Sequence, residues 1–171
     1  MTSGGLALEG LLGEFVADTP GARHALVLSG EGLTLGRSPG LPVDLADHLA
    51  AIASGIQSLT RGASAQFGDG SGGVRQSMTE FHGGTLFIVE AGTAAHLAVI
   101  GEEFADAGAI GRGMGLVAES VRAALADDGR VAYRAPGTAG TTIGTGSGAG
   151  TGTGTRSRTG SPARGYGKPR A

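Results

Sequence analysis

The chain changes character at Ala135, and this change limits how much of it can fold. Residues 1–134 alternate apolar stretches with turn signals, whereas residues 135–171 consist largely of Gly, Thr, Ser and Arg. The second segment has only two large apolar side chains, Ile143 and Tyr166. Such a segment buries too little apolar area to offset the entropy of ordering it. The sequence therefore predicts one domain over 1–134 and a disordered tail over 135–171.

Charge divides at the same point. Residues 1–134 carry eight Arg and 15 Asp or Glu, a net charge of −7, while residues 135–171 carry four Arg and one Lys, a net charge of +5, giving −2 in total. Phosphate binding needs clustered Lys and Arg, so no nucleic acid is expected as a partner of the acidic domain. The charges of the tail are widely spaced, which favours a solvated linker over a specific binding segment.

Hydrophobic periodicity predicts the element order α-β-β-α-β-β-β-α. Helical spacing marks residues 6–18, 43–62 and 110–126, and strand-length apolar runs mark residues 24–29, 33–36, 74–81, 85–90 and 94–100. The last three strands are expected to form an antiparallel meander. Five strands and three helices in this order predict a two-layer or three-layer α+β domain.

The helix predicted over residues 43–62 carries two stripes. The large apolar stripe, which we expect to face the sheet, consists of Leu45, Leu49, Ile52, Ile56 and Leu59. The other stripe is made of small residues, Ala51, Gly55, Ser58 and Gly62. Small residues allow another backbone to approach closely, as in paired membrane helices. Helix pairing and an ordinary exposed face explain this stripe equally well.

No pattern of reactive side chains indicates catalysis or metal binding. There is no cysteine, the only lysine lies outside a P-loop motif, and no serine lies in a G-x-S-x-G elbow. Four histidines share no metal-ligand spacing, so structural roles are favoured: His24, His48, His82 and His96. His24 and His96 could approach one another on neighbouring strands, but two imidazoles without a carboxylate make a poor site. The sequence predicts no catalytic residue, no metal site and no cofactor.

Two further segments have plain structural explanations. The glycine-rich run Gly108–Gly115 lies where a helix begins, which suits anion capture, yet no strand leads directly into it and a loop that opens the helix is favoured. The acidic residues Glu102, Glu103 and Asp106 precede that helix, where negative charge favours the helix dipole. No signal peptide or apolar run of membrane-spanning length is visible, so a cytoplasmic protein is expected.

Several phrases resemble the roadblock (dynein light-chain 7-type) domain family, in its actinobacterial branch. In residues 21–38, the strand Ala25-Leu-Val-Leu-Ser29 leads through Glu31-Gly32 into a second strand, as in the opening hairpin of these domains. Residues 45–63 resemble their central helix, and residues 74–81 and 84–91 their third and fourth strands. The resemblance extends over about residues 6–128 and rests on the joint order of these phrases.

The resemblance implies an α/β, profilin-like sandwich in which a five-stranded antiparallel sheet and three helices form a homodimer. In this family the central helices of two subunits pair, and their third strands join the two sheets into one. Carried to this sequence, the dimer interface comprises Ala51, Gly55, Ser58, Gly62, Val74, Gln76 and Met78. Pairing of this kind also protects an edge strand that is otherwise exposed.

The resemblance further implies a non-enzymatic adaptor or regulator of a small Ras-like GTPase. Related gene clusters also encode a sensor histidine kinase and an accessory protein, which are possible further partners and could recruit the protein to the membrane. Arg37, Arg61 and Arg75 are candidates for an arginine supplied to the GTPase, although a solvated surface role is simpler for each. The alternative is a small-molecule sensor, for which the sequence shows no convergent polar cluster.

Overall fold

The computed structural model describes residues 3–127, which form eight elements in the predicted order. These elements are α1 (Ser3–Asp18), β1 (Ala22–Ser29), β2 (Thr34–Arg37), α2 (Val43–Phe67), β3 (Gln76–Phe81), β4 (Gly84–Glu90), β5 (Ala95–Glu102) and α3 (Ala107–Asp127). The strands form one antiparallel sheet in the order β2-β1-β5-β4-β3. The predicted α/β sandwich is therefore confirmed, and the predicted tail lies outside the described residues.

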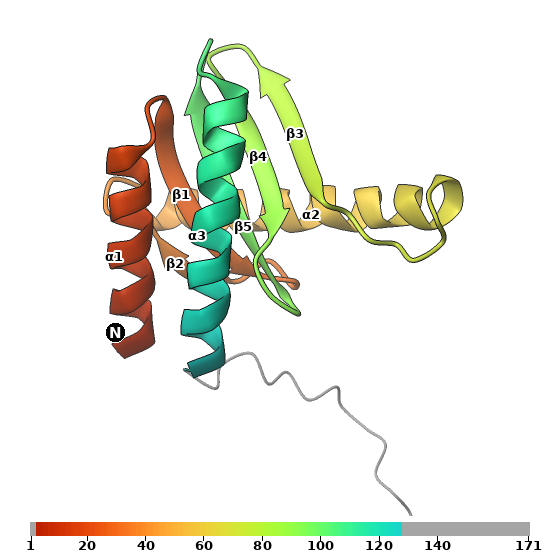
Figure 1. The fold of residues 1–171 in the computed structure, drawn as a ribbon, viewed down its shortest axis with the longest axis horizontal. Helices are drawn as coiled ribbons and strands as arrows, with labels where there is room; N and C mark the ends of the chain where they lie inside the picture. Colours follow the sequence, from red (N-terminus) through yellow and green to blue (C-terminus); the bar gives the residue numbers. More distant parts are fainter. Residues whose placement is uncertain (1–2, 128–171) are drawn as a thin grey trace, which may run out of the picture. The chain divides into compact units, whose positions relative to one another are not determined.

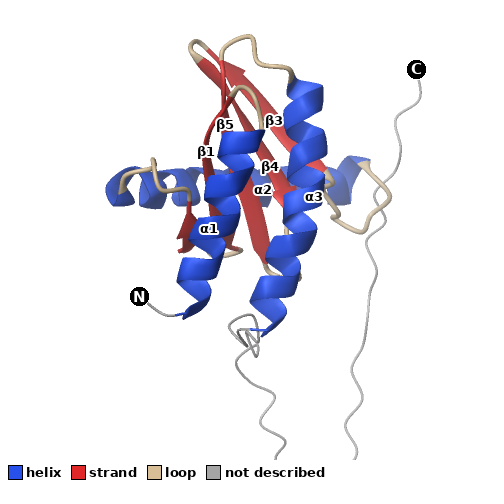
Figure 2. Cartoon of the chain, turned by 60° about the vertical axis from the view of Figure 1, so that its left-hand side comes forward, coloured by secondary structure: helices blue, strands red, loops and turns tan. Residues whose placement is uncertain are grey.

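Helices cover both faces of the sheet. Helices α1 and α3 lie side by side on one face, and α2 crosses the other face (Figures 1 and 2). Strand β1 is buried on both sides, because Ala25 and Val27 belong to the core under α1 and α3 while Leu26 and Leu28 belong to the core under α2. Alternation of side chains along a strand explains why this central strand has a continuous apolar run.

The predicted orientation of α2 is wrong for three of its large residues. Leu45, Ile52 and Leu59 are 55%, 56% and 78% exposed, so they do not face the sheet. The buried side of α2 instead consists mostly of small residues: Ala46, Leu49, Ala50, Ala53 and Gln57. Alanines bring the helix axis close to the strands, and the spacing of the large apolar residues did not reveal this side of the helix. The small residues Ala51, Gly55, Ser58 and Gly62 are exposed, as expected.

The glycine-rich run at Gly108–Gly115 is helical, so the expected loop at this position is wrong. Helix α3 begins at Ala107, and the carboxylate of Asp106 accepts hydrogen bonds from the backbone N–H groups of Gly108 and Ala109, at 2.8 and 3.0 Å. This contact caps the helix N-terminus. Gly113 serves packing, since a Cβ there would lie 3.0 Å from Cε2 of Phe15 in α1.

Candidate functional site

An uncovered apolar surface runs along the outer side of α2. Leu45, Ile52 and Leu59 repeat every seventh residue on one side of the helix and border the stripe of small residues. Neither Gly55 nor Gly62 has any other part of the chain near its missing side chain, within 4 Å. A monomer seldom leaves such a helix face open, so the surface is suited to a partner. The sequence prediction missed the three large residues because it assigned them to the core.

Strand β3 forms one edge of the sheet, next to this surface. It is paired only with β4, and its other edge is free within the part of the chain that the structure describes. Most of its side chains are exposed, including Met78 (52%) and Phe81 (47%). A free edge of six residues is a ready template for pairing with another strand.

The strand register separates the predicted interface residues between the two faces of the sheet. Met78 lies opposite Phe87, whose side chain belongs to the core under α1 and α3, so Met78 and Gln76 project on that face. Phe81 lies on the other face, the one that α2 covers, because it alternates with Met78. Val74 is half-buried in the loop before β3 rather than in the strand. The predicted residues therefore flank one edge without forming a single patch.

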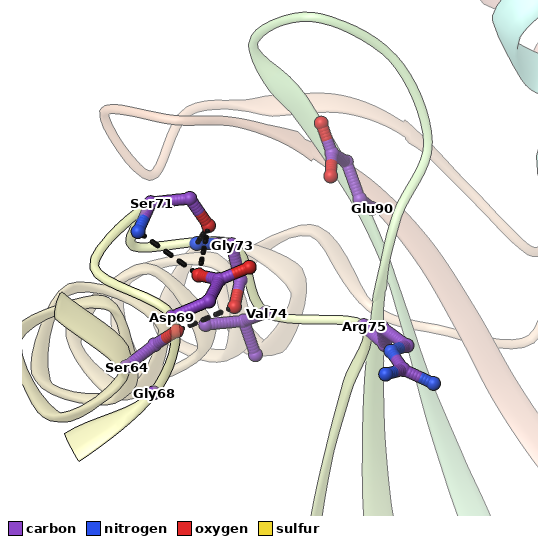
Figure 3. Close-up of a pocket in the computed structure, with 8 residues that line it drawn as sticks. All are labelled: Ser64, Gly68, Asp69, Ser71, Gly73, Val74, Arg75 and Glu90. Carbon is purple, nitrogen blue, oxygen red and sulfur yellow. Dashed lines mark hydrogen bonds between the residues drawn. The ribbon is translucent and has the colours of Figure 1, made fainter.

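The loop between α2 and β3 is held in shape by its own polar groups (Figure 3). The carboxylate of Asp69 accepts hydrogen bonds from the backbone N–H and the hydroxyl of Ser71, at 2.9 and 2.6 Å, and these bonds lower the pKa of Asp69. Ser64 of α2 donates to the carbonyl of Gly73 at 2.7 Å. Gly70 and Gly72 adopt positive φ angles of 83° and 72°, which favour glycine.

This loop walls two adjoining cavities of about 470 and 560 Å³, which share four lining residues. The larger one is lined by side chains of α2 and by two residues from the ends of β4 and β5, Glu90 and His96. Glu90 and His96 lie opposite each other in the β4–β5 pair, on the face of the sheet that α2 covers. The cavity therefore occupies the place where the C-terminal half of α2 leaves the sheet.

A convergent polar cluster lies in the wall of the larger cavity. Arg61 contacts His96, with 3.1 Å between Nη2 and Nε2, and Gln57 lies one turn earlier in α2. Gln57 and His96 are each only 3% exposed, yet Nε2 of Gln57 and Nδ1 of His96 have no hydrogen-bond partner in residues 3–127. An unpaired buried polar group costs about 1–3 kcal/mol. The sequence prediction missed this cluster because its members come from two distant elements.

The Arg61 contact fixes the protonation of His96. A guanidinium only donates hydrogen bonds, so Nε2 of His96 accepts and the neutral ring carries its proton on Nδ1. Burial lowers the pKa of His96, the positive charge of Arg61 lowers it further, and Glu90 acts in the opposite direction. His96 is therefore a neutral hydrogen-bond donor at neutral pH.

The three arginine candidates differ in whether contacts within the chain hold their guanidinium groups. Arg37 donates to the carbonyl of Leu41 at 2.6 Å, and Arg61 is engaged with His96. Arg75 is exposed, and no hydrogen bond or ion pair within residues 3–127 holds its guanidinium. Figure 3 shows its side chain pointing away from the loop network. Arg75 is thus the candidate that is free to reach a partner.

The remaining titratable residues do not assemble a site. His24 and His96 lie on adjacent strands, but His24 is opposite Ile100, four positions along β5 from His96, so the two imidazoles do not meet. No group of three or more His, Asp or Glu side chains within the described part of the chain is placed to hold a metal ion. None of the helices in this region is long and apolar enough to cross a membrane.

Comparison with known proteins identifies the class to which this fold belongs. The family model described as Roadblock/LC7 domain matches residues 8–101, which include α2 and the free-edged strand β3. The match extends over more than half of the chain, and the chain belongs to the Roadblock/LC7 domain family. A search of curated proteins gave no match.

Solved structures agree with this assignment. A Roadblock/LC7 domain from Streptomyces avermitilis is 40% identical, with a TM-score of 0.66 over 70% of this chain and 98% of that one. A second such domain, also from that organism, is 34% identical, with a TM-score of 0.55 over 66% and 96% of the two chains. The gliding protein MglB from Thermus thermophilus is 21% identical, with a TM-score of 0.64 over 74% and 94%, and shares the fold.

Proposed function

We propose that this protein is a homodimeric, non-enzymatic regulator of a small Ras-like GTPase. The observation that carries the proposal is the free edge of β3 next to the uncovered face of α2, in a chain of the Roadblock/LC7 family. Pairing of two β3 edges satisfies backbone groups that are otherwise left to water. Pairing of two α2 helices covers Leu45, Ile52 and Leu59 and brings the small-residue stripes into contact.

In this proposal the protein contributes shape and charge to the GTPase rather than catalytic chemistry of its own. Arg75 is the side chain offered to the nucleotide site, because its guanidinium is exposed and makes no contact that would hold it back. An arginine supplied in this way stabilises charge that develops during phosphoryl transfer. A histidine kinase and an accessory protein remain proposed partners on family resemblance alone.

The proposal is tested with the GTPase encoded nearest to this gene. GTP hydrolysis and GDP release by that GTPase are measured with rising amounts of this protein, and one of the two rates is expected to change in a saturable manner. The Arg75→Gln variant is expected to weaken a stimulation of hydrolysis by at least about tenfold. Arg122→Gln is the matched control, since Arg122 lies on α3 and is already paired with Glu119 at 2.6 Å.

The outcomes are distinguishable. A saturable effect that the Arg75→Gln variant retains supports the regulation of the GTPase and contradicts the role proposed for Arg75. No effect on either rate, together with no binding of the GTP-loaded or GDP-loaded GTPase, contradicts the proposed function. Nucleotide turnover by this protein alone contradicts its non-enzymatic character.

A further inference from the structure

We propose that the larger cavity beside α2 is a binding site for a small organic carboxylate that carries an amino group. The proposal stands on the polar cluster in its wall and is independent of the GTPase partner. The cavity measures about 560 Å³, a volume typical of sites for small molecules. It gives the protein a route by which a metabolite can act on the same helix, α2, that is proposed to form the dimer.

The donors are placed by the helix repeat. Gln57, Arg61 and Ala65 line the cavity from successive turns of α2, since residues four apart share a helix face. His96 faces them from β5 and is held by Arg61. Three donor groups from two elements therefore converge on one wall, and a few convergent polar groups are what a small-molecule site contains.

The donors require an acceptor. The Nδ1–H group of His96 and the side-chain amide N–H groups of Gln57 are buried and have no acceptor within residues 3–127. The guanidinium of Arg61 has no carboxylate partner either, because the one ion pair in this part of the chain joins Arg122 and Glu119. A carboxylate accepts several hydrogen bonds, donates none, and matches the planar fork of an arginine.

Glu90 determines which second charged group the ligand carries. Its carboxylate lines the cavity next to His96, its partner across the β4–β5 pair, and has no hydrogen-bond or ion-pair partner in the described residues. A second carboxylate on the ligand is repelled there, whereas an ammonium group is attracted. The lining therefore favours a short amino acid over a dicarboxylate. The loop that lines one side of the cavity is already held by Asp69, Ser71 and Ser64, so little ordering is needed on binding.

The test is a nuclear magnetic resonance titration of the full chain with three small probes. The imidazole signals of His96 and the backbone amide signals of Gly72 and Gly73 are followed as 4-aminobutyrate is added. Saturable shifts of these signals are expected. Succinate, which replaces the amine with a second carboxylate, is expected to bind more weakly, and 4-aminobutanamide, which lacks the carboxylate, is expected to cause no saturable shift.

Variants assign the binding to the cavity. Arg61→Gln is expected to weaken 4-aminobutyrate binding by at least about tenfold, because it removes a charge-assisted pair. Arg122→Gln is the matched control and is expected to bind like wild type. Gln57→Leu supplies a second variant, with several-fold weaker binding expected. Glu90→Gln is expected to reduce the preference for 4-aminobutyrate over succinate.

Three results would overturn the proposal. The first is the absence of saturable shifts with 4-aminobutyrate, or binding of succinate that is as tight as that of 4-aminobutyrate. The second is binding that Arg61→Gln and Gln57→Leu leave unchanged, or shifts that map away from α2 and the loop. The third is Arg61-dependent binding of inorganic phosphate with no response to either carboxylate, which would make the cavity a phosphate site instead. Because the GTPase is absent from this experiment, its failure leaves the proposed regulation untouched.

Discussion

At the scale of single residues, His96 shows how burial decides chemistry. It sits in β5 with 3% exposure, holds Arg61 through Nε2 and keeps an unpaired Nδ1. Sequence spacing favoured a structural role for all four histidines, since none forms a metal pair. The structure places the ring in the wall of a cavity. This position depends on contacts with α2, which is distant from His96 in the sequence, so the tertiary structure was needed to reveal it.

The lowered pKa of His96 predicts that the protein loses stability in weak acid. In the unfolded chain the ring takes up a proton near its ordinary pKa of 6.5, whereas in the folded chain it does so only at lower pH. The unfolded state therefore binds more protons than the native state as the pH falls below 6.5, and the free energy of unfolding decreases. Stability from this group is complete above that pH and is lost progressively below it.

The measurement is the thermal midpoint of wild type and of His96→Gln between about pH 7.5 and about pH 5. Gln keeps an acceptor for Arg61 but cannot titrate, so the variant is expected to lose less stability than wild type over this range. His24, whose pKa is also lowered by burial and by Arg23, contributes equally to both proteins. Parallel pH profiles for the two proteins would contradict the prediction.

At the scale of elements, glycine and alanine set the distances between layers. In α2 the buried side is rich in alanine, and in α3 Gly113 allows α1 to approach. Helix formation itself was predictable from apolar spacing in all three helices, with bounds that differ by three to five residues at some ends. The side that a helix turns to the sheet was predictable for α1, where Leu8, Leu12 and Phe15 are buried as their spacing suggests, and for α3, where the aligned residues Ile110, Met114 and Val121 are buried. It was not predictable for α2.

Gly113 offers a direct test of this packing. A Cβ there would lie 3.0 Å from Phe15 and 3.2 Å from the hydroxyl of Thr19, so Gly113→Val is expected to destabilise the fold by about 1–3 kcal/mol. Gly115→Val is the matched control, because nothing lies within 4 Å of that position and valine forms helix slightly better than glycine. Chemical denaturation of the three proteins gives the change in the free energy of unfolding for each variant. Equal stability of the two variants would place the contact between α1 and α3 in doubt.

At the scale of the whole molecule, the free edge of β3 and the outer face of α2 predict association through both. Gly55→Leu adds a large side chain where the described residues leave open space, so the protomer is expected to fold normally. Leucine even favours the helix by up to about 1 kcal/mol relative to glycine. In the proposed dimer the same side chain separates two helices that pack within about 8–10 Å of each other.

Sedimentation equilibrium of wild type, Gly55→Leu and Gly10→Leu distinguishes the possibilities. Gly10 is the matched control, since it is an exposed helical glycine in α1 without neighbours within 4 Å, on the other side of the sheet. Wild type and Gly10→Leu are expected to be dimers, and Gly55→Leu a monomer or a weaker dimer with the same circular dichroism spectrum. A wild type that stays monomeric at high concentration contradicts the dimer. A fully dimeric Gly55→Leu moves the interface away from the centre of α2.

The sequence by itself determined the element order, the sheet-forming runs and the family resemblance, because apolar period and turn residues are local properties of a chain. The tertiary structure decided what depends on contacts between distant segments. Spacing assigned the large apolar stripe of α2 to the sheet, whereas packing against β1 selected a different side that is rich in alanine and left Leu45, Ile52 and Leu59 outside. The cluster of Gln57, Arg61 and His96 arose in the same way, since its members are up to 39 positions apart in the sequence and meet only when α2 lies across β5.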